Sequence, residues 1–167
     1  MLIRVISGGQ TGVDEAALVA AKTSRLATGG YMPKGFRRLD GNHPEFQQLY
    51  GMLEDQEPGY KHRTWQNVLL ADGTIRIAKN FDSPGEKCTL NAIKYYNRKH
   101  LDIPDRFIRN KEDIRTTCMV LDTWLRVNNI EVLNVAGNSE QSAPGIFIVA
   151  RDFLLTMFKF LMDVDMR

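Results

Sequence analysis

The start of the chain constrains the fold most strongly, because an apolar run, a glycine-rich turn and an alanine-rich segment follow one another directly. Residues 2–6 are nearly all apolar and predict a strand covered on both faces. Residues 7–14 form the turn, and Val13, Ala17, Ala20 and Ala21 follow at helical spacing. Glycines let the backbone approach an anion, and the first turn of a helix offers unpaired N–H groups. We therefore predict that residues 7–14 bind the phosphate of a nucleotide or nucleotide-like cofactor.

Composition indicates one ordinary globular domain, residues 1–167, with no nucleic-acid or membrane partner. Hydrophobic residues make up 43% of the chain and charged residues 25%, which are normal globular values. The net charge of +2 is too small to indicate nucleic-acid binding. The N-terminus resembles no signal peptide, and no apolar stretch is long enough to span a bilayer. The 2 cysteines form no disulfide framework, so we expect a reducing, cytoplasmic location.

Strands and helices are predicted to alternate along the rest of the chain. The predicted strands are residues 26–31, 74–78, 104–108 and 130–135. The predicted helices are residues 63–70, 88–99, 111–128 and a closing helix to about Asp163, with Ser142 as its cap. Residues 36–60 are polar and rich in glycine and proline, and they predict an irregular, ordered loop over the site.

This alternation predicts the α/β class: a single Rossmann-like domain with an open, mostly parallel sheet and helices on both faces. In such sheets ligands bind beyond the C-terminal ends of the strands. The loops at residues 7–14, 29–35, 82–85 and 136–140 should therefore converge on one crevice.

Side chains beside these loops supply the candidate ligand contacts. Lys34 and Arg63 are the best candidates for phosphate partners, although each could be a solvated surface cation. Asp72 could accept hydrogen bonds from a base or ribose, or serve only as a turn residue before a strand. Ser83 and Gly85 precede a predicted helix and indicate a second anion site.

Simpler interpretations stand beside these. Thr11-x-x-Asp14 matches a capping box, so residues 7–14 could be a turn that needs no ligand. Asp14 could also bond a ribose hydroxyl or hold a metal, and Thr89 could contact the ligand or its own helix. No metal site is expected, because no metal-ligand spacing joins the cysteines to the histidines, His43, His62 and His100. The apolar closing helix could pack in the core or form a dimer face.

Residues 7–18 resemble the opening motif of the molybdenum-cofactor carrier family, in the YpsA-related branch of the SLOG (Lonely Guy-like) nucleotide-binding superfamily. The similarity continues in family order through residues 29–35, 63–74, 83–89, 133–137 and 144–146. It implies a Rossmann-like fold that binds a nucleotide, a nucleotide-derived signal or a molybdopterin-type cofactor, and a homo-oligomer, dimer or tetramer. Together with the loop positions, it indicates these ligand-binding residues: Ser7, Gly8, Gly9, Gln10, Thr11, Gly12, Asp14, Gly30, Lys34, Arg63, Asp72, Ser83, Gly85, Thr89, Gly137 and Asn138.

The chain differs from the motifs of related families at positions that matter for catalysis. The phosphoribohydrolases of the superfamily carry Pro-Gly-Gly-x-Gly-Thr-x-x-Glu. The closest stretch here, residues 83–91, lacks the second glycine of that pattern and its helical glutamate. Glu15 stands where related chains usually carry an arginine, and Asn138-Ser139 stand where they often carry Pro-Arg. We therefore predict a carrier, sensor or sequestering protein without turnover. The competing hypothesis is a nucleotide hydrolase that cleaves an N-glycosidic or phosphate bond, with Glu86, Glu140 or Asp14 as the general acid or base.

Overall fold

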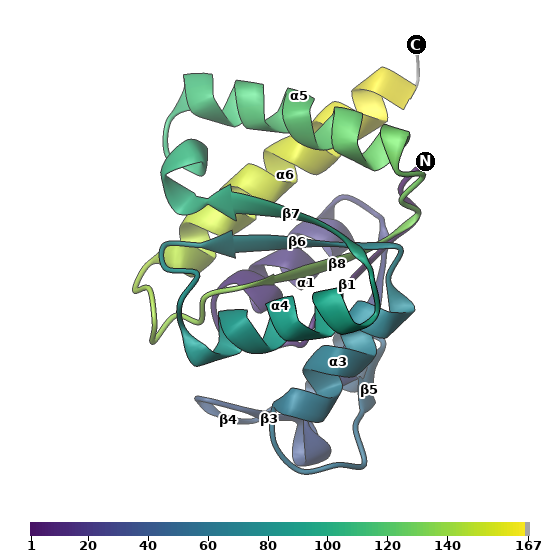
Figure 1. The fold of residues 1–167 in the computed structure, drawn as a ribbon, viewed down its shortest axis with the longest axis vertical. Helices are drawn as coiled ribbons and strands as arrows, with labels where there is room; N and C mark the ends of the chain where they lie inside the picture. Colours follow the sequence, from purple (N-terminus) through teal and green to yellow (C-terminus); the bar gives the residue numbers. More distant parts are fainter. Residues whose placement is uncertain (166–167) are drawn as a thin grey trace.

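Six parallel strands form the central sheet of the computed structural model, which describes residues 1–165 (Figure 1). Their spatial order is β5-β2-β1-β8-β6-β7, and each neighbouring pair is parallel. In chain order the strands are β1 (Arg4–Ile6), β2 (Ala27–Met32), β5 (Met52–Glu54), β6 (Gly73–Ala78), β7 (Lys99–Pro104) and β8 (Val132–Gly137). This arrangement confirms the predicted α/β fold with an open parallel sheet.

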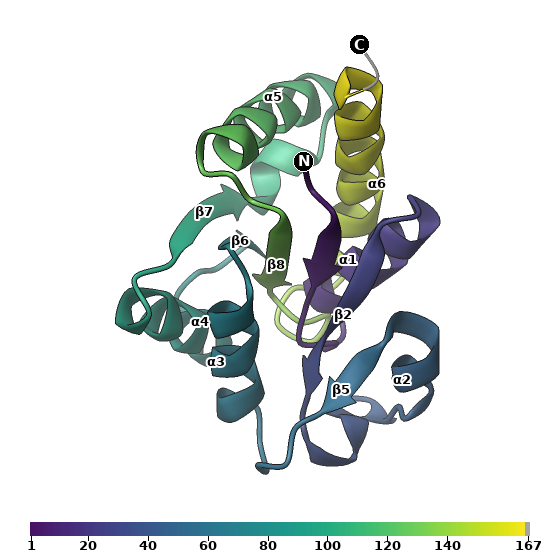
Figure 2. The ribbon, with the colours of Figure 1, turned by 90° about the vertical axis from the view of Figure 1, so that its right-hand side faces the viewer.

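Helices cover both faces of the sheet (Figure 2). One face carries α1 (Val13–Thr23), α5 (Lys111–Val127) and α6 (Ile146–Asp165), and the other carries α3 (Lys61–Leu70) and α4 (Pro84–Tyr95). The shorter elements are α2 (Glu45–Tyr50), the 3-10 turns η1 (Lys34–Phe36) and η2 (Asp105–Ile108), and a hairpin of β3 (Arg37–Arg38) with β4 (Gly41–Asn42).

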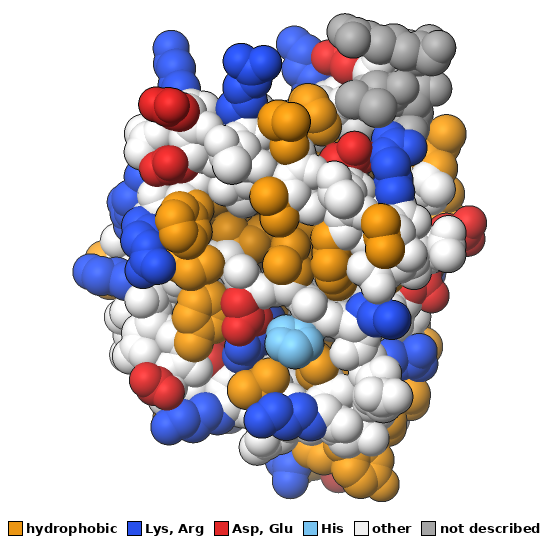
Figure 3. All heavy atoms as spheres, turned by 45° about the horizontal axis from the view of Figure 1, so that its top comes forward, with side chains coloured by type: hydrophobic (Ala, Val, Ile, Leu, Met, Phe, Trp, Pro, Cys, Tyr) orange, Lys and Arg blue, Asp and Glu red, His pale blue; other side chains and the backbone are white. Residues whose placement is uncertain are grey.

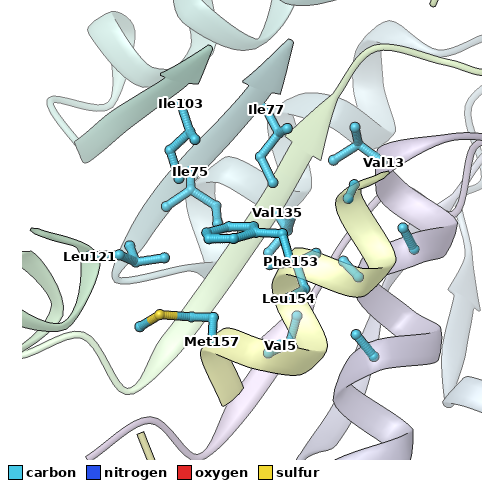
Figure 4. Packing of buried hydrophobic residues seen from close by; sticks show 14 of the residues in the cluster. Val5, Val13, Ile75, Ile77, Ile103, Leu121, Val135, Phe153, Leu154 and Met157 are labelled. Atoms are coloured by element: carbon cyan, nitrogen blue, oxygen red, sulfur yellow. The ribbon is translucent and has the colours of Figure 1, made fainter. Parts of the chain in front are cut away.

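The main core lies between the sheet and α6 (Figure 4). Phe153, Leu154 and Met157 of α6 are fully buried and pack with Ile75 of β6 and Val135 of β8. The alanines of α1 are fully buried too, and their small side chains let α6 approach closely. The largest apolar side chains of the closing helix therefore pack in the core.

Several predicted boundaries are wrong for identifiable reasons. A strand is predicted at residues 104–108, but β7 ends at Pro104 and η2 follows it. The helix predicted from residue 88 begins at Pro84, because Ser83 is its N-cap and accepts a hydrogen bond from Glu86 N. The closing helix begins at Ile146, so Ser142 is not its cap and bonds instead to Ser139.

Residues 36–60 are also more regular than predicted. They contain the β3–β4 hairpin, α2 and the edge strand β5, which pairs with β2. Phe46 of α2 and Met52 of β5 are buried against Leu18 and Met32. This segment is therefore mainly an extension of the sheet, and only part of it borders the site described below.

Exposed apolar side chains gather on the face shown in Figure 3, among lysines, arginines and carboxylates at its margins. On α5, Met119 and Val120 are each more than half exposed. Within residues 1–165, no helix is both long and apolar enough to cross a membrane.

Candidate functional site

A cavity of about 460 Å³ lies where the carboxyl ends of β1, β6 and β8 meet the first turns of α1 and α4. Parallel α/β sheets bind ligands at this edge, and the volume falls within the usual range for small-molecule sites. The walls come from the loops at residues 7–14, 82–85 and 136–140 together with α3; they include Gly8, Gln10, Asp14, Tyr60, Lys61, Arg63, Asn67, Ser83, Gly85, Glu86, Cys88, Thr89, Gly137 and Asn138. Three of the four loops predicted to converge do so.

The first glycine loop, residues 7–14, already satisfies most of its own backbone donors. The N–H of Gly9 donates to Ser7 Oγ at 3.2 Å, and that of Gln10 donates to Asp14 Oδ2 at 3.3 Å. The N–H of Thr11 donates to Gln10 Oε1 at 2.9 Å, and that of Val13 donates to Asn138 O at 3.1 Å. The capping-box alternative is wrong in detail, because the N-cap of α1 is Gly12 and makes no side-chain cap. The carboxyl group of Asp14 itself therefore occupies the Gln10 amide of this loop.

Asp14 pairs with Arg63 of α3 inside the cavity. Arg63 Nη1 lies 3.2 Å from Asp14 Oδ2, and both side chains are largely buried. Burial raises the pKa of Asp14, although Arg63 and the N–H groups of Gln10 and Gly8 oppose the rise. A Cβ on Gly8 would lie 1.3 Å from Arg63 Nη1, so the guanidinium rests directly on the glycine backbone. Within residues 1–165, Arg63 Nε is buried without a hydrogen-bond partner.

The second glycine loop, residues 82–85, leaves the start of α4 open. Ser83 Oγ accepts the Glu86 N–H only weakly, at 3.4 Å, and the first N–H groups of a helix have no intrahelical partner. A Cβ placed on Gly85 would meet nothing within 4 Å. Thr89 Oγ1 donates to Gly85 O at 3.1 Å, so this hydroxyl faces its own helix and retains acceptor capacity toward the cavity. An anion can approach this helix end.

Glu86 borders the cavity, but its carboxyl group is withdrawn into the protein. The residue is 2% exposed, and Asn138 Nδ2 lies 3.5 Å from Oε1. Oε2 is buried without a hydrogen-bond partner among residues 1–165 and lies 3.7 Å from Arg76 Nη1. Burial raises the pKa of Glu86 to about 8; Arg76 opposes this rise, and the negative charges of Asp14 and Asp102 add to it. Glu86 is therefore mainly a neutral acid near pH 7.

Arg76 is a buried cation that the sequence reading missed. Its guanidinium, on β6, bonds to Asp102 Oδ1 of β7 at 2.8 Å and to the Glu86 carbonyl at 3.0 Å. A charged residue inside an otherwise apolar buried strand was the available signal. Asn67 of α3 was likewise not proposed as a site residue, and it joins Ser7 O at 3.1 Å to Tyr31 N at 2.8 Å.

Among the predicted residues with charged side chains, Lys34, Asp72 and Glu140 do not line the cavity. Lys34 is exposed on η1. Asp72 lies at the opposite, amino-terminal edge of the sheet, where its carboxylate accepts the N–H groups of Glu131 at 3.0 Å and Val132 at 2.8 Å. Glu140 accepts the N–H of Phe147 at 3.0 Å and that of Gly145, and so holds the start of α6. The position of Asp72 favours its turn alternative, and Glu140 is engaged in a structural contact that the sequence did not predict.

Other predicted residues shape the site through the backbone. Gly30 has φ of 118°, and a Cβ there would lie 2.2 Å from Ser7 O. A Cβ on Gly137 would lie 2.1 Å from Ile77 O, and one on Gly12 2.5 Å from Asn138 O. Asn138 Oδ1 accepts the N–H groups of Lys79 at 2.9 Å and Asn80 at 3.2 Å. These residues hold the loops together beneath the cavity.

The described part of the chain, residues 1–165, contains no cluster of three or more histidine, cysteine or carboxylate side chains that could hold a metal ion. Cys88 borders the cavity as a free, half-buried thiol. Cys118 is buried in the core, and burial raises its pKa to about 11.

The chain is similar in sequence to one protein family and in structure to one solved protein. The sequence profile described as the circularly permutated YpsA SLOG family matches residues 5–158. A crystal structure from Syntrophus aciditrophicus SB, of a protein provisionally named a molybdenum carrier protein, is 32% identical. The similarity covers 94% of each chain with a TM-score of 0.84. No curated protein matches the chain significantly.

Proposed function

The chain belongs to the circularly permutated YpsA SLOG family, and from that premise we propose that its cavity binds a phosphate-bearing nucleotide or nucleotide derivative. A molybdopterin-type cofactor falls within this class, and the provisional name of the structural relative supports its inclusion. The protein acts in this proposal as a carrier, sensor or sequestering protein.

One observation carries the proposal: the open start of α4 and the buried guanidinium of Arg63 border the same cavity. A helix start favours an anion through its N–H groups and its dipole. Arg63 keeps an unused donor, because its buried Nε has no hydrogen-bond partner within residues 1–165. A phosphate at α4 would therefore meet the Gly85 amide and an arginine already desolvated for the interaction.

The positions of the carboxyl groups favour binding over turnover. Asp14 is held by Arg63 and by the amides of its own loop. Glu86 Oε2 is sealed beside Arg76, and Glu140 holds the start of α6. A general acid or base must reach the reacting atom directly or through one water, and none of these groups is so exposed.

The hydrolase alternative is favoured by one observation: the carboxyl residues Asp14 and Glu86 border the same cavity. Glu86 has a pKa of about 8, and Asp14, whose pKa burial also raises, has Arg63 as its cationic partner. A neutral acid beside an ionised carboxylate is the pair that cleavage of a glycosidic bond requires. Ligand binding would have to turn the Glu86 carboxyl toward the cavity for this chemistry.

Direct identification of a bound compound tests the proposal. The purified protein is denatured, and the released small molecules are identified by mass spectrometry. A panel of nucleoside monophosphates and a phosphorylated pterin is then screened for thermal stabilisation. We expect at least one compound to raise the Tm of the protein and of Arg37→Gln, an exposed arginine outside the cavity, but not of Arg63→Gln. Absence of a shift with every compound would contradict the proposal.

The same samples separate binding from hydrolysis. After prolonged incubation, chromatography should recover the bound nucleotide unchanged. Release of free base or phosphate that is lost in Glu86→Gln would support the hydrolase instead.

We also propose a cytoplasmic homo-oligomer, a dimer or tetramer. The free thiols of Cys88 and Cys118 support a reducing location, and exposed Met119 and Val120 on α5 support self-association. Light scattering coupled to size exclusion should give twice or four times the chain mass. Met119→Lys with Val120→Lys should then give a monomer.

A further inference from the structure

A second groove of about 560 Å³ lies on the outer side of α3, next to the cavity. Lys61 borders both spaces, so one flexible ammonium group stands between them. The groove walls are otherwise distinct: they include Pro58, His62, Trp65 and Tyr96, which do not line the cavity. A ligand longer than a mononucleotide could therefore leave the cavity past Lys61.

The groove carries the features of a site for a flat ring. Trp65 and Tyr96 meet edge to face, with ring centroids 5.7 Å apart, and both are half-buried. The Lys61 ammonium lies 5.5 Å from the centroid of the Trp65 ring. Trp65 Nε1 is buried without a hydrogen-bond partner within residues 1–165, so this donor is unused. Aromatic walls of this kind bind heteroaromatic rings by stacking.

His62 gives the groove a polar edge in a fixed orientation. Its Nδ1 lies 2.7 Å from Oδ2 and 2.8 Å from Oδ1 of Asp55, which is 3% exposed. Because Nδ1 is engaged by this buried carboxylate, Nε2 is the ring nitrogen left for another partner. Together, His62 and Trp65 suit a ring that has both donors and acceptors on its edge.

We propose that the ligand has two ring systems joined through phosphate, the second ring lying on Trp65 and His62 and the linking phosphate beside Lys61. This inference rests on the proposed function, because it places the first half of the ligand in the cavity. The ligand class is therefore a dinucleotide or another nucleotide diphosphate that carries a second heteroaromatic ring.

Fluorescence and affinity measurements test this directly. AMP, GMP, CMP and UMP are compared with the corresponding symmetric dinucleoside diphosphates, by calorimetry and by emission of Trp65 in a Trp124→Phe background, which leaves a single tryptophan. We expect a dinucleoside diphosphate to bind about tenfold more tightly than its mononucleotide and to quench Trp65 more strongly.

A matched pair of histidine variants supplies the control. His62→Gln should reduce the affinity for the dinucleoside diphosphate severalfold and leave the mononucleotide unaffected. His100→Gln, at an exposed histidine of β7 outside the groove, should change neither affinity. Equal affinities for the two compounds, with Trp65 emission unchanged, would overturn the second site while leaving the proposed function intact. Failure of every compound to bind would overturn both.

Discussion

The two glycine loops of the site both lead from a strand into a helix, but they differ in how their backbone amides are used. Residues 7–14 form a tight turn whose amides are used by Ser7, Gln10 and Asp14 of the same loop. Residues 82–85 lead to a helix start with free space around Gly85. A glycine-rich strand-to-helix turn can therefore hold an internal carboxylate or remain available to a ligand, and the sequence motif does not distinguish the two. In this protein the open position is α4, beside Glu86 and Arg63.

The largest expected effect concerns Glu86, which directly follows the second glycine loop. Its pKa is about 8 in the folded protein against an ordinary 4.5. The folded protein therefore binds a proton that the unfolded chain has released, and stability is lost as the pH rises from about 4.5 to about 8. Glu86→Gln keeps the neutral shape and removes this loss.

We expect Glu86→Gln to match the wild type near pH 4.5 and to exceed its unfolding free energy by on the order of 4 kcal/mol at pH 8. Urea denaturation across this pH range measures the difference. A gap that does not grow with pH would show that Glu86 is ionised in the folded state.

Gly8→Ala should destabilise the first glycine loop, residues 7–14. Its Cβ would displace the Arg63 guanidinium and leave the buried carboxylate of Asp14 without its cation. Gly8 is not among the glycines with positive φ, so the effect comes from this contact rather than from backbone strain. We expect a loss of roughly 2 kcal/mol in unfolding free energy, measured by chemical denaturation. Unchanged stability would mean that the Arg63–Asp14 pair is not needed.

The Asp14→Asn variant tests whether the carboxylate in the first glycine loop weakens ligand binding. Removing the carboxylate removes a negative charge from the cavity and frees Arg63. We expect a phosphate-bearing nucleotide to bind about tenfold more tightly, as measured by calorimetry. Weaker binding would instead assign Asp14 a direct contact with the ligand, such as a ribose hydroxyl.

Gly85→Ala should have the smallest effect on folding, because its new methyl group meets open space. We expect the unfolding free energy to change by less than about 0.5 kcal/mol. The same methyl group stands at the proposed phosphate position, so nucleotide affinity should fall severalfold in calorimetry. Unaltered affinity would place the phosphate elsewhere.

Local patterns and the family resemblance were sufficient to predict the sheet, the amphipathic helices and the edge where the cavity lies. They were insufficient for the start of α4, because Pro84 and Gly85 were interpreted as loop although proline is favoured in a first helical turn. For Asp72, the turn alternative agrees with the structure and the ligand alternative does not, because the residue precedes a strand and ligands bind after strands.

The ion pairs of the site lay beyond sequence reasoning. Arg63 and Asp14 are 49 residues apart in the chain, and their pairing depends on how α3 packs against β2 and β8. The withdrawal of Glu86 depends on Arg76, a strand residue 10 positions earlier whose side chain crosses beneath α4. Neither relation follows from periodicity or from a motif, since both arise from tertiary packing.

The central claim is that phosphate binds at α4 rather than at the first glycine loop. Backbone amide shifts in ¹H–¹⁵N spectra, followed during titration with the nucleotide that stabilises the protein best, measure this residue by residue. The claim predicts the largest shifts at Gly85 and Glu86, with a change at the Arg63 Nε–H. Largest shifts at Gly9, Gln10 and Thr11, with those of Gly85 unchanged, would contradict it.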